Sequence, residues 1–228
     1  MNKGKLYGVG VGPGDPELLT LKAIRILRGC AVIAVPHRDK DQCFALRIAL
    51  GAVPELAEKP LLEVDMPMTK DEDLREQAYR AGVELLRAEL DAGRDVAFLT
   101  LGDPTIYSTY CYLHERILAL GYDAEIVPGV PSFCASAAAL NIPLCENSQE
   151  LHILPGTYSP TESLSYPGVK VFMKNDLPAT LAAAREQKLS ARMVENCGTA
   201  QQQLYRSIDE IPENAGYYSL LIIKEDGQ

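Results

Sequence analysis

The chain has 228 residues, of which 47% are hydrophobic and 23% are charged, and its net charge is −9. This length allows one large or two small domains, and the composition is typical of a globular enzyme rather than a disordered or fibrous protein. The acidic balance argues against nucleic acid as a partner, because phosphate backbones favour basic protein faces. No apolar run reaches the roughly 18 residues of a membrane span, and the six residues before the first glycine-rich stretch are too few for a signal peptide. We therefore expect a cytoplasmic protein without a membrane partner.

Six cysteines and three histidines are scattered along the sequence without the spacing of a metal site. There is no CxxC pair, no zinc-type spacing and no HExxH motif. We therefore expect no metal centre, and we interpret the cysteines as reduced, mostly buried thiols.

Strands and helices are predicted to alternate in the first part of the chain. Short apolar runs indicate strands, and apolar residues at helical spacing indicate amphipathic helices. The predicted strands are 5–10, 30–35, 95–100 and 124–127, and the predicted helices are 17–28, 70–92, 108–120 and 132–140. This alternation is typical of a parallel sheet covered by helices.

After residue 141 the pattern changes to short strands with one clear helix. The predicted strands are 151–154, 169–173, 192–195, 203–206 and 217–223, the helix is 178–187, and the turn-rich stretch 155–168 is predicted as a surface loop. The fold class is therefore α/β with two α/β domains, residues 1–145 and residues 146–228.

Ligands of open α/β sheets gather at the carboxyl ends of the strands, and the first loop there is the glycine-rich stretch 8–16. A dinucleotide fingerprint would need glycine at the positions of Pro13 or Asp15, and a P-loop would need Lys-Ser/Thr after the glycines. Neither motif is present. Two interpretations stay open. The stretch is either a tight turn in which Asp15 caps the next helix, with Pro16 at its first position, or a surface against which a large flat ligand lies.

Two further loops follow predicted strands, residues 102–110 and 128–132. In the first of them Gly102 permits an unusual φ and Pro104 fixes the chain, while Asp103 adds a hydrogen-bonding group. Each loop is also explained as a turn with an N-cap, at Ser132 in the second case. The three loops in this order and spacing are a more specific signal than any one of them.

The three loops together resemble the tetrapyrrole methyltransferases of cobalamin synthesis. The resemblance covers essentially the whole chain, and "GDPTIYST" is most similar to the precorrin-2 C20-methyltransferases. It is carried by GVGPGD at 10–15, LLTLK at 18–22, GDPTIYST at 102–109 and PGVPS at 128–132. The resemblance implies two α/β domains with S-adenosylmethionine (SAM) in a cleft between them, and a homodimer.

The implied reaction moves the methyl group of SAM to the C20 meso carbon of precorrin-2 or cobalt-factor II and leaves S-adenosylhomocysteine. The chemistry needs little acid–base machinery, because holding the carbon and the methyl group in line at about 3–3.5 Å supplies most of the rate.

By this resemblance, Tyr107 is the side chain nearest the reacting centre; a core aromatic is the alternative. The expected cofactor residues are Leu101, Gly102, Asp103, Ile106, Ser108, Thr109, Ser132, Met173, Asn175, Asn196, Tyr218 and Ser219.

The first loop is expected to face the trough where the macrocycle lies. The substrate bears carboxylate arms, so an acidic protein needs a local group of cations to bind it. Arg38 and Lys40 are expected to bind these arms, and a solvated charged loop is the alternative. The full expected substrate set is Gly12, Pro13, Gly14, Asp15, His37, Arg38 and Lys40.

Two other functions stay open. One is a methyltransferase of the same fold that acts on another corrin carbon, on diphthine or on ribosomal RNA; the negative charge disfavours RNA, and "TIYST" disfavours diphthine. The other is a non-catalytic regulator that binds SAM or a tetrapyrrole.

Overall fold

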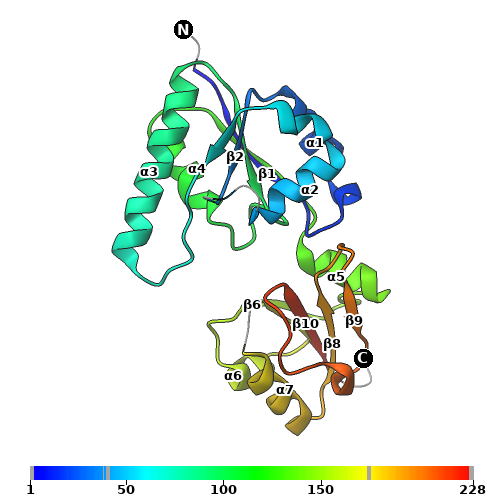
Figure 1. Cartoon of the computed structure of the whole chain (residues 1–228). Helices are drawn as coiled ribbons and strands as arrows, with labels where there is room; N and C mark the ends of the chain where they lie inside the picture. Colours follow the sequence, from blue (N-terminus) through cyan, green and yellow to red (C-terminus); the bar gives the residue numbers. More distant parts are fainter. Residues whose placement is uncertain (1–2, 38, 40–41, 174–175, 226–228) are drawn as a thin grey trace. The chain divides into compact units, whose positions relative to one another are not determined.

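The computed structural model describes residues 3–37, 39, 42–173 and 176–225 (Figure 1). Contacts divide the chain into two compact units, Met1–Pro131 and Ser132–Gln228. The sequence placed the boundary at 145/146. The structure places the helix α5 (Ser132–Leu140) in the second unit, because α5 contacts strands of the second sheet.

The first unit is a five-stranded sheet with helices between the strands. All its strand pairs are parallel, in the order β3-β2-β4-β1-β5, so the predicted alternating parallel architecture is confirmed. Its main elements are β1 (Leu6–Gly10), α1 (Leu21–Gly29), β2 (Val32–Val35), α2 (Phe44–Ala52), β3 (Leu61–Glu63), α3 (Glu72–Asp91), β4 (Val96–Thr100), α4 (Tyr110–Ala119) and β5 (Ala124–Val127).

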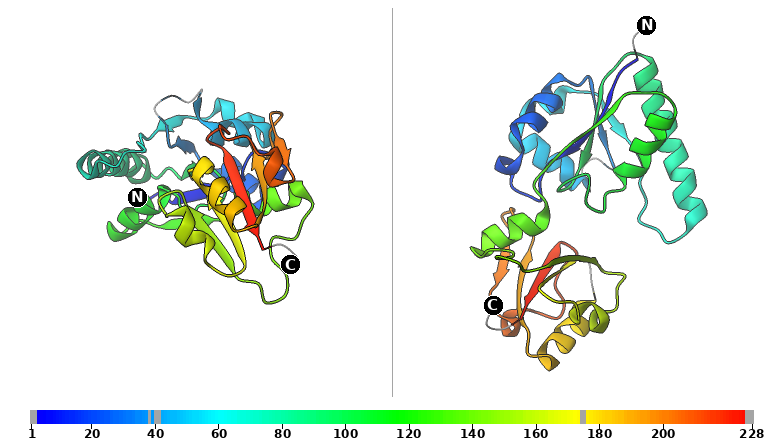
Figure 2. Two further views of the ribbon diagram at one scale, coloured as in Figure 1. Left: turned by 90° about the horizontal axis from the view of Figure 1, so that it is seen from below. Right: turned by 180° about the vertical axis from the view of Figure 1, so that it is seen from behind.

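Helices cover both faces of this sheet, as Figures 1 and 2 show: α1 and α2 lie on one face, and α3 and α4 on the other. Alternate residues of each strand enter the two cores. In β4, Leu99 packs in the core under α1 and α2, and Phe98 in the core under α3 and α4. The strands are therefore apolar on both faces, which is why they appear in the sequence as continuous apolar runs.

The chain between β1 and α1 forms two capped turns in succession. Asp15 accepts a hydrogen bond from the Glu17 amide (2.8 Å) and begins a 3₁₀ helix at Pro16–Leu18. Thr20 accepts from the Ala23 amide (3.1 Å) and begins α1. The capping role of Asp15 is confirmed, but the predicted helix over 17–28 is wrong in its first turn, because the second cap interrupts it.

The sequence missed five elements of the described chain. Phe44–Ala52 carries a single charged residue, Arg47, among apolar and small residues, so few polar positions mark the outer face of α2 in the sequence. The stretch predicted as a surface loop contains a one-turn helix that begins with a proline. The missed elements are α2, a 3₁₀ helix at Pro54–Glu58, β3, α6 (Pro160–Leu164) and a 3₁₀ helix at Ile208–Glu210.

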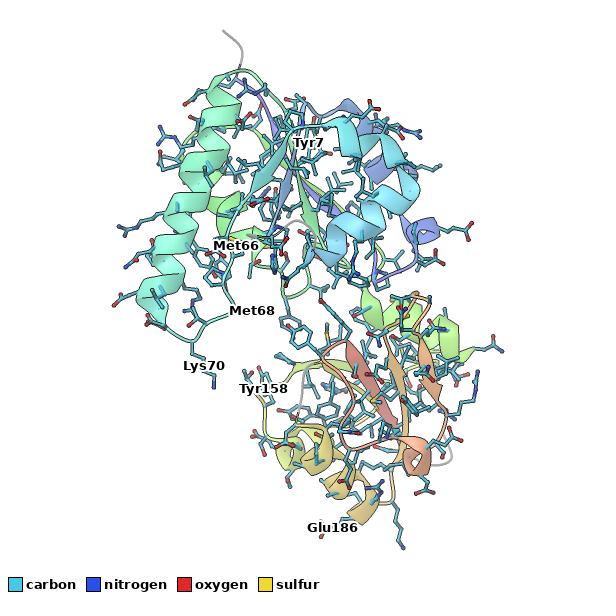
Figure 3. The ribbon with its side chains drawn as sticks, in the orientation of Figure 1. Tyr7, Met66, Met68, Lys70, Tyr158 and Glu186 are labelled. Atoms are coloured by element: carbon cyan, nitrogen blue, oxygen red, sulfur yellow. The ribbon has the colours of Figure 1, made fainter. Side chains whose placement is uncertain are left out.

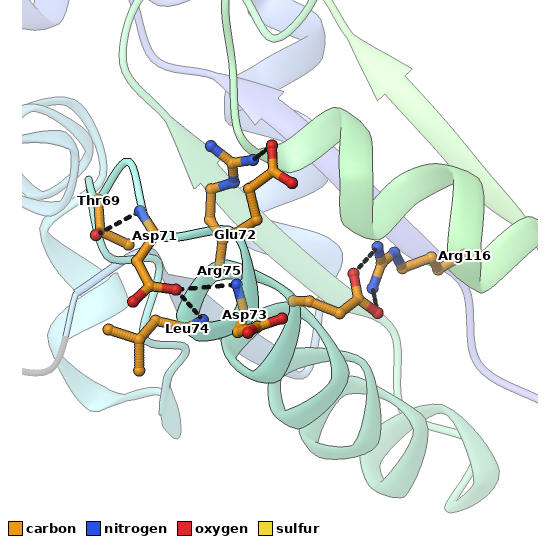
Figure 4. A network of polar contacts seen from close by, with 8 residues as sticks. Thr69, Asp71, Glu72, Asp73, Leu74, Arg75 and Arg116 are labelled. Carbon is orange, nitrogen blue, oxygen red and sulfur yellow. Dashed lines mark hydrogen bonds and ion pairs between the residues drawn. The ribbon is translucent and has the colours of Figure 1, made fainter.

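The helix α3 is fixed at its start by caps and along its length by ion pairs (Figure 4). Asp71 accepts hydrogen bonds from the amides of Asp73 (3.0 Å) and Leu74 (3.1 Å). Arg116 of α4 pairs with Glu76 at 2.7 Å, and hydrogen bonds from Arg116 and Arg80 lower the pKa of Glu76 to about 2. The two helices on this face are therefore joined by charge as well as by packing.

The segment between β3 and α3 leaves the core gradually. Met66 is 7% exposed and points into the fold, whereas Met68 is 78% exposed and lies on the outside with Lys70 (Figure 3). The polar and exposed end of this segment then leads into the cap of α3.

The second unit is a mixed five-stranded sheet in the order β6-β7-β10-β8-β9. The β6–β7 pair is parallel and the other pairs are antiparallel. The remaining elements are β6 (Leu151–Pro155), β7 (Val169–Met173), α7 (Leu177–Glu186), β8 (Ser190–Glu195), β9 (Gln203–Tyr205), a 3₁₀ helix at Ile208–Glu210 and β10 (Ser219–Lys224). Its five strands and the helix α7 match the predicted ones closely.

The helix α5 is tied into the second unit at its carboxyl end. It contacts β8 and β10. Arg206 donates to the Leu140 carbonyl oxygen (2.8 Å), and Lys224 donates to that of Pro143 (2.8 Å). These two bonds satisfy carbonyl groups near the end of the helix, where charged donors are favourable.

All six cysteines are free, but they are less buried than the sequence suggested. Cys30 and Cys43 are buried, and burial raises the pKa of Cys30 to about 12. Cys134 and Cys145 are exposed, because one lies on the outer side of α5 and the other in the turn that follows it, and the remaining two are half-buried. The prediction of mostly buried thiols was therefore wrong.

Candidate functional site

The carboxyl ends of β1, β4 and β5 lie side by side in the first unit. Gly10 is opposite Thr100, and Val9 is opposite Val127. Beyond the strands, the Gly102 amide donates to the Gly12 carbonyl oxygen (2.8 Å), and the Gly12 amide donates to that of Gly102 (3.3 Å). The first two predicted loops are therefore joined by their backbones.

Three glycines allow these loops to approach one another closely. A Cβ atom built on Gly10 would lie 2.7 Å from the Gly102 oxygen and 2.6 Å from the Gly129 nitrogen. A Cβ atom on Gly129 would lie 2.2 Å from the Gly102 oxygen. No side chain fits at either position without moving backbone, so all three loops pack backbone to backbone.

The side chain of Asp103 joins the second loop to the third. The residue is 8% exposed. One carboxylate oxygen accepts from the amide (2.8 Å) and the hydroxyl group of Thr105, and the other accepts from the Gly129 amide (2.9 Å). The predicted unusual backbone just before it is confirmed, because Gly102 has φ +71°.

Tyr107 has a strained backbone and an exposed ring. Its φ is +49°, which lies in the left-handed region that residues other than glycine rarely adopt. The ring is part of a residue that is 60% exposed, so the alternative interpretation as a core aromatic was wrong. Beside it, the Ser108 hydroxyl oxygen accepts from the Tyr110 amide (3.2 Å), which helps to start α4. Residues held in strained conformations cluster at functional sites.

The other predicted residues of the second loop differ in exposure. Leu101 is 37% exposed, while Ile106 and Thr109 are half-buried. Thr109 is the N-cap residue of α4 but makes no capping bond with its side chain.

The glycines of the first loop are explained in part by the protein itself. A Cβ atom on Gly8 would lie 2.0 Å from the buried Tyr110 ring, and Gly10 packs against the other two loops. Gly12 has φ +75° and is bonded to Gly102, so a substitution at Gly12 disturbs both loops. Gly12, Pro13 and Gly14 are buried, and Asp15 is half-buried at the cap described above.

Of the three predicted substrate cations, only His37 belongs to the described residues. It is half-buried and its Nδ1 accepts from the Asp39 amide (2.9 Å). Arg38 and Lys40 lie outside the residues that the structure describes.

In the second unit, four of the predicted cofactor residues lie along one edge of the sheet. Met173 at the end of β7 is opposite Leu220, and the Asn196 amide after β8 donates to the Tyr218 carbonyl oxygen (2.9 Å). Ser219 is the first residue of β10. The structure therefore brings Met173, Asn196, Tyr218 and Ser219 to the same edge. Asn175 lies outside the described residues, and Ser132 begins α5.

A pocket of about 240 Å³ opens near this edge. Its lining consists of Leu177, Met193, Ala215, Gly216, Tyr217, Ser219 and Leu221. The loop beside it is fixed by Glu195, whose carboxylate accepts from the Gly216 amide (2.6 Å). This volume is below the roughly 300–1,000 Å³ of sites that enclose a drug-sized ligand, so the pocket fits only part of one.

Sequence reasoning missed this pocket except for Ser219. Its lining is assembled from α7, β8, β10 and the turn before β10, and these residues lie too far apart in the chain to form a local motif.

Within the described ranges, no helix combines the length and apolar character needed to cross a lipid bilayer. In those same ranges, no three His, Cys, Asp or Glu side chains are grouped as they would be around a metal ion.

Loops gathered at the carboxyl edge of a parallel sheet are typical of α/β enzymes that bind small molecules there. The family model of the tetrapyrrole (corrin/porphyrin) methylases matches residues 5–212. The chain therefore belongs to the tetrapyrrole methylase family.

Individual relatives give the same result. A protein of Methanocaldococcus jannaschii named probable cobalt-precorrin-2 C(20)-methyltransferase is 41% identical over 66% of this chain. A precorrin-2 C(20)-methyltransferase of Sinorhizobium sp is 33% identical over 96% of this chain and 95% of its own length. The aligned stretch spans 64% of the M. jannaschii protein and only 46% of a Mycobacterium tuberculosis relative named cobalamin biosynthesis protein CobIJ.

A solved structure has the same two-unit fold. The uroporphyrin-III C-methyltransferase of Thermus thermophilus, in complex with S-adenyl homocysteine, superposes with a TM-score of 0.70. It is 26% identical, and the match covers 97% of this chain and 98% of the other.

Proposed function

We propose that the chain is a SAM-dependent C-methyltransferase that methylates C20 of precorrin-2 or cobalt-factor II in cobalamin synthesis. The names of two relatives support this reaction, one of them over 96% of the chain. The observation that carries the proposal is the edge where β1, β4 and β5 end. There the loop with "GDPTIYST" is held by backbone contacts to both neighbouring loops.

The residues present fit SAM in two respects. At the first edge, Leu101 is exposed and directly precedes Gly102, whose backbone is fixed by its bonds to Gly12, so the loop presents an accessible residue on a rigid backbone to a ligand. At the second edge, the pocket beside Ser219 is lined by both apolar side chains and polar groups and is large enough for part of a ligand, such as the adenine ring. The Thermus neighbour with S-adenyl homocysteine supports the same cofactor.

SAM, when bound, supplies a methyl group made electrophilic by its sulfonium. We assign its methionine part to the backbone of Leu101, Gly102 and Asp103 and to Ile106, with Ser108, Thr109 and Ser132 near them. We assign its adenosine part to the edge with Met173, Asn196, Tyr218 and Ser219, and to Asn175.

In this proposal, the chain's own residues hold SAM and the substrate in position and exclude water from between them. The exposed ring of Tyr107 restricts where the methyl group and the substrate carbon meet, which is the main source of rate for a carbon that is already nucleophilic. Residues 12–15 face the macrocycle, and His37, Arg38 and Lys40 bind its carboxylate arms.

We also propose that the enzyme is a cytoplasmic homodimer whose partner in catalysis is the small-molecule tetrapyrrole alone. The homodimer rests on resemblance to the family, and the cytoplasmic location rests on the sequence. Light scattering on a sizing column tests the oligomeric state.

A turnover assay with methyl-labelled SAM tests the proposed function. Purified protein is incubated with precorrin-2 and, separately, with cobalt-factor II. We expect labelled trimethylated product from at least one of them, and the faster substrate shows whether the enzyme acts before or after cobalt insertion. Binding of SAM without product from either substrate would favour a non-catalytic regulator, and transfer to RNA or diphthine would favour the other methyltransferases of this fold.

A further inference from the structure

The carboxylate of Asp103 makes contacts on two different loops. Toward its own loop it accepts from the amide and the hydroxyl group of Thr105. Toward the loop after β5 it accepts from the Gly129 amide at 2.9 Å. At 8% exposed, the residue is nearly closed to solvent.

These bonds leave the carboxylate little capacity for another partner. A carboxylate has about four lone-pair positions, and three of them are occupied here. A group that contacts a ligand or accepts a proton during a reaction needs a free position directed at it. The geometry of Asp103 is that of a connector between loops.

The connection acts where the three loops already touch. The Gly102 oxygen lies against both Gly10 and Gly129, so a small shift of the second loop would bring it into collision with a neighbour or open a gap. The bond from Gly129 to Asp103 fixes this spacing from one side, and the backbone pair with Gly12 fixes it from the other.

We propose that Asp103 is a positioning residue, whose carboxylate holds the backbone of the 101–106 loop in the arrangement that binds SAM. The carboxylate itself does not contact SAM and does not accept a proton in the reaction. This inference rests on the proposed function, because it takes SAM as the ligand of that loop.

The substitution Asp103→Asn tests the proposal with little change in size. The amide oxygen can still accept from Thr105, but the NH2 group then faces the Gly129 amide, which is also a donor. We expect the Gly129 amide to exchange with solvent at least about tenfold faster by NMR. We expect the Kd for SAM, measured by calorimetry, to rise about 10- to 100-fold, as for loss of a bond to a charged group.

Two further variants separate positioning from other roles. Thr105→Val removes one donor on the same loop and keeps the Gly129 bond, so it should raise the Kd only about two- to fivefold. Gly129→Ala keeps Asp103 but pushes against the Gly102 oxygen. It should raise the Kd as Asp103→Asn does. In the double variant Asp103→Asn/Gly129→Ala, the loss of binding free energy should be smaller than the sum of the two single losses, because both substitutions disturb the same contact.

The kinetic constants distinguish positioning from proton acceptance. A positioning role predicts that the KM for SAM rises and that kcat/KM for SAM falls more than kcat does. If Asp103→Asn abolishes kcat while the Kd for SAM and the exchange of Gly129 stay unchanged, the proposal is wrong and the carboxylate takes part in the chemistry.

The failure of the proposed function gives a different result. If the wild-type protein does not bind SAM, the proposed function fails, and accelerated exchange of Gly129 in Asp103→Asn would still establish the connector. If Asp103→Asn does not fold, the comparison of Thr105→Val and Gly129→Ala decides: equal, unchanged affinities for SAM in both would overturn the positioning role.

Discussion

Replacing Tyr107 with glycine is expected to lower the rate of methyl transfer at least tenfold while leaving the free energy of unfolding unchanged or raising it by about 1 kcal/mol. The backbone at this position has φ +49°, which glycine adopts without the cost that a bulky side chain carries. The activity falls because the exposed ring is lost, and the stability rises because the strain is lost. Urea unfolding and turnover with methyl-labelled SAM measure the two effects on the same samples.

Two companion variants separate the ring from the backbone. Tyr107→Ala loses the ring but keeps the strain, so it should be as inactive as the glycine variant without any gain in stability. Tyr107→Phe keeps the ring, so it should retain most of the activity if the ring only restricts positions. Full activity in the glycine variant would contradict the role of Tyr107 near the reacting centre.

Replacing Gly8 with alanine is expected to lower the free energy of unfolding by about 2–3 kcal/mol or to prevent folding. The added Cβ would lie 2.0 Å from a ring carbon of Tyr110, which is fully buried under β1 and packs against Phe98. The ring cannot move away easily, because its hydroxyl group is also bonded to His114 Nδ1 at 3.0 Å. Urea unfolding followed by circular dichroism gives the size of the loss.

The matched control is Gly29→Ala at the end of α1. A Cβ atom there meets nothing within 4 Å, so we expect a change of less than about 0.5 kcal/mol, or a small gain from helix propensity. Equal stability of the Gly8 and Gly29 variants would show that the close packing of Tyr110 against β1 is not essential.

Much of the fold follows from the sequence because its signals are local. Apolar runs predicted the strands of both sheets except β3, and capping residues such as Asp15 marked where helical turns begin. The helix α2 was missed because it has only one charged residue, Arg47, to mark its outer face in the sequence. The boundary between the units was misplaced because the packing partner of α5 is a strand more than fifty residues later.

The site was predicted as three loops, but not as one structure. The sequence indicates a glycine with an unusual φ at position 102, and the structure has it. The sequence does not indicate that Gly10 and Gly129 both pack against Gly102, or that Asp103 bonds to Gly129. These contacts join residues far apart in the chain. The left-handed backbone of Tyr107 is equally invisible, since tyrosine is an unusual residue for it.

The most direct test of the central claim is to locate the methyl group that the enzyme transfers. The protein is incubated with precorrin-2 or cobalt-factor II and SAM carrying a ¹³C-methyl group, and the product is examined by carbon NMR. We predict one new methyl resonance on the C20 meso carbon. A methyl group on any other carbon, or no labelled tetrapyrrole from either substrate, would contradict the proposal.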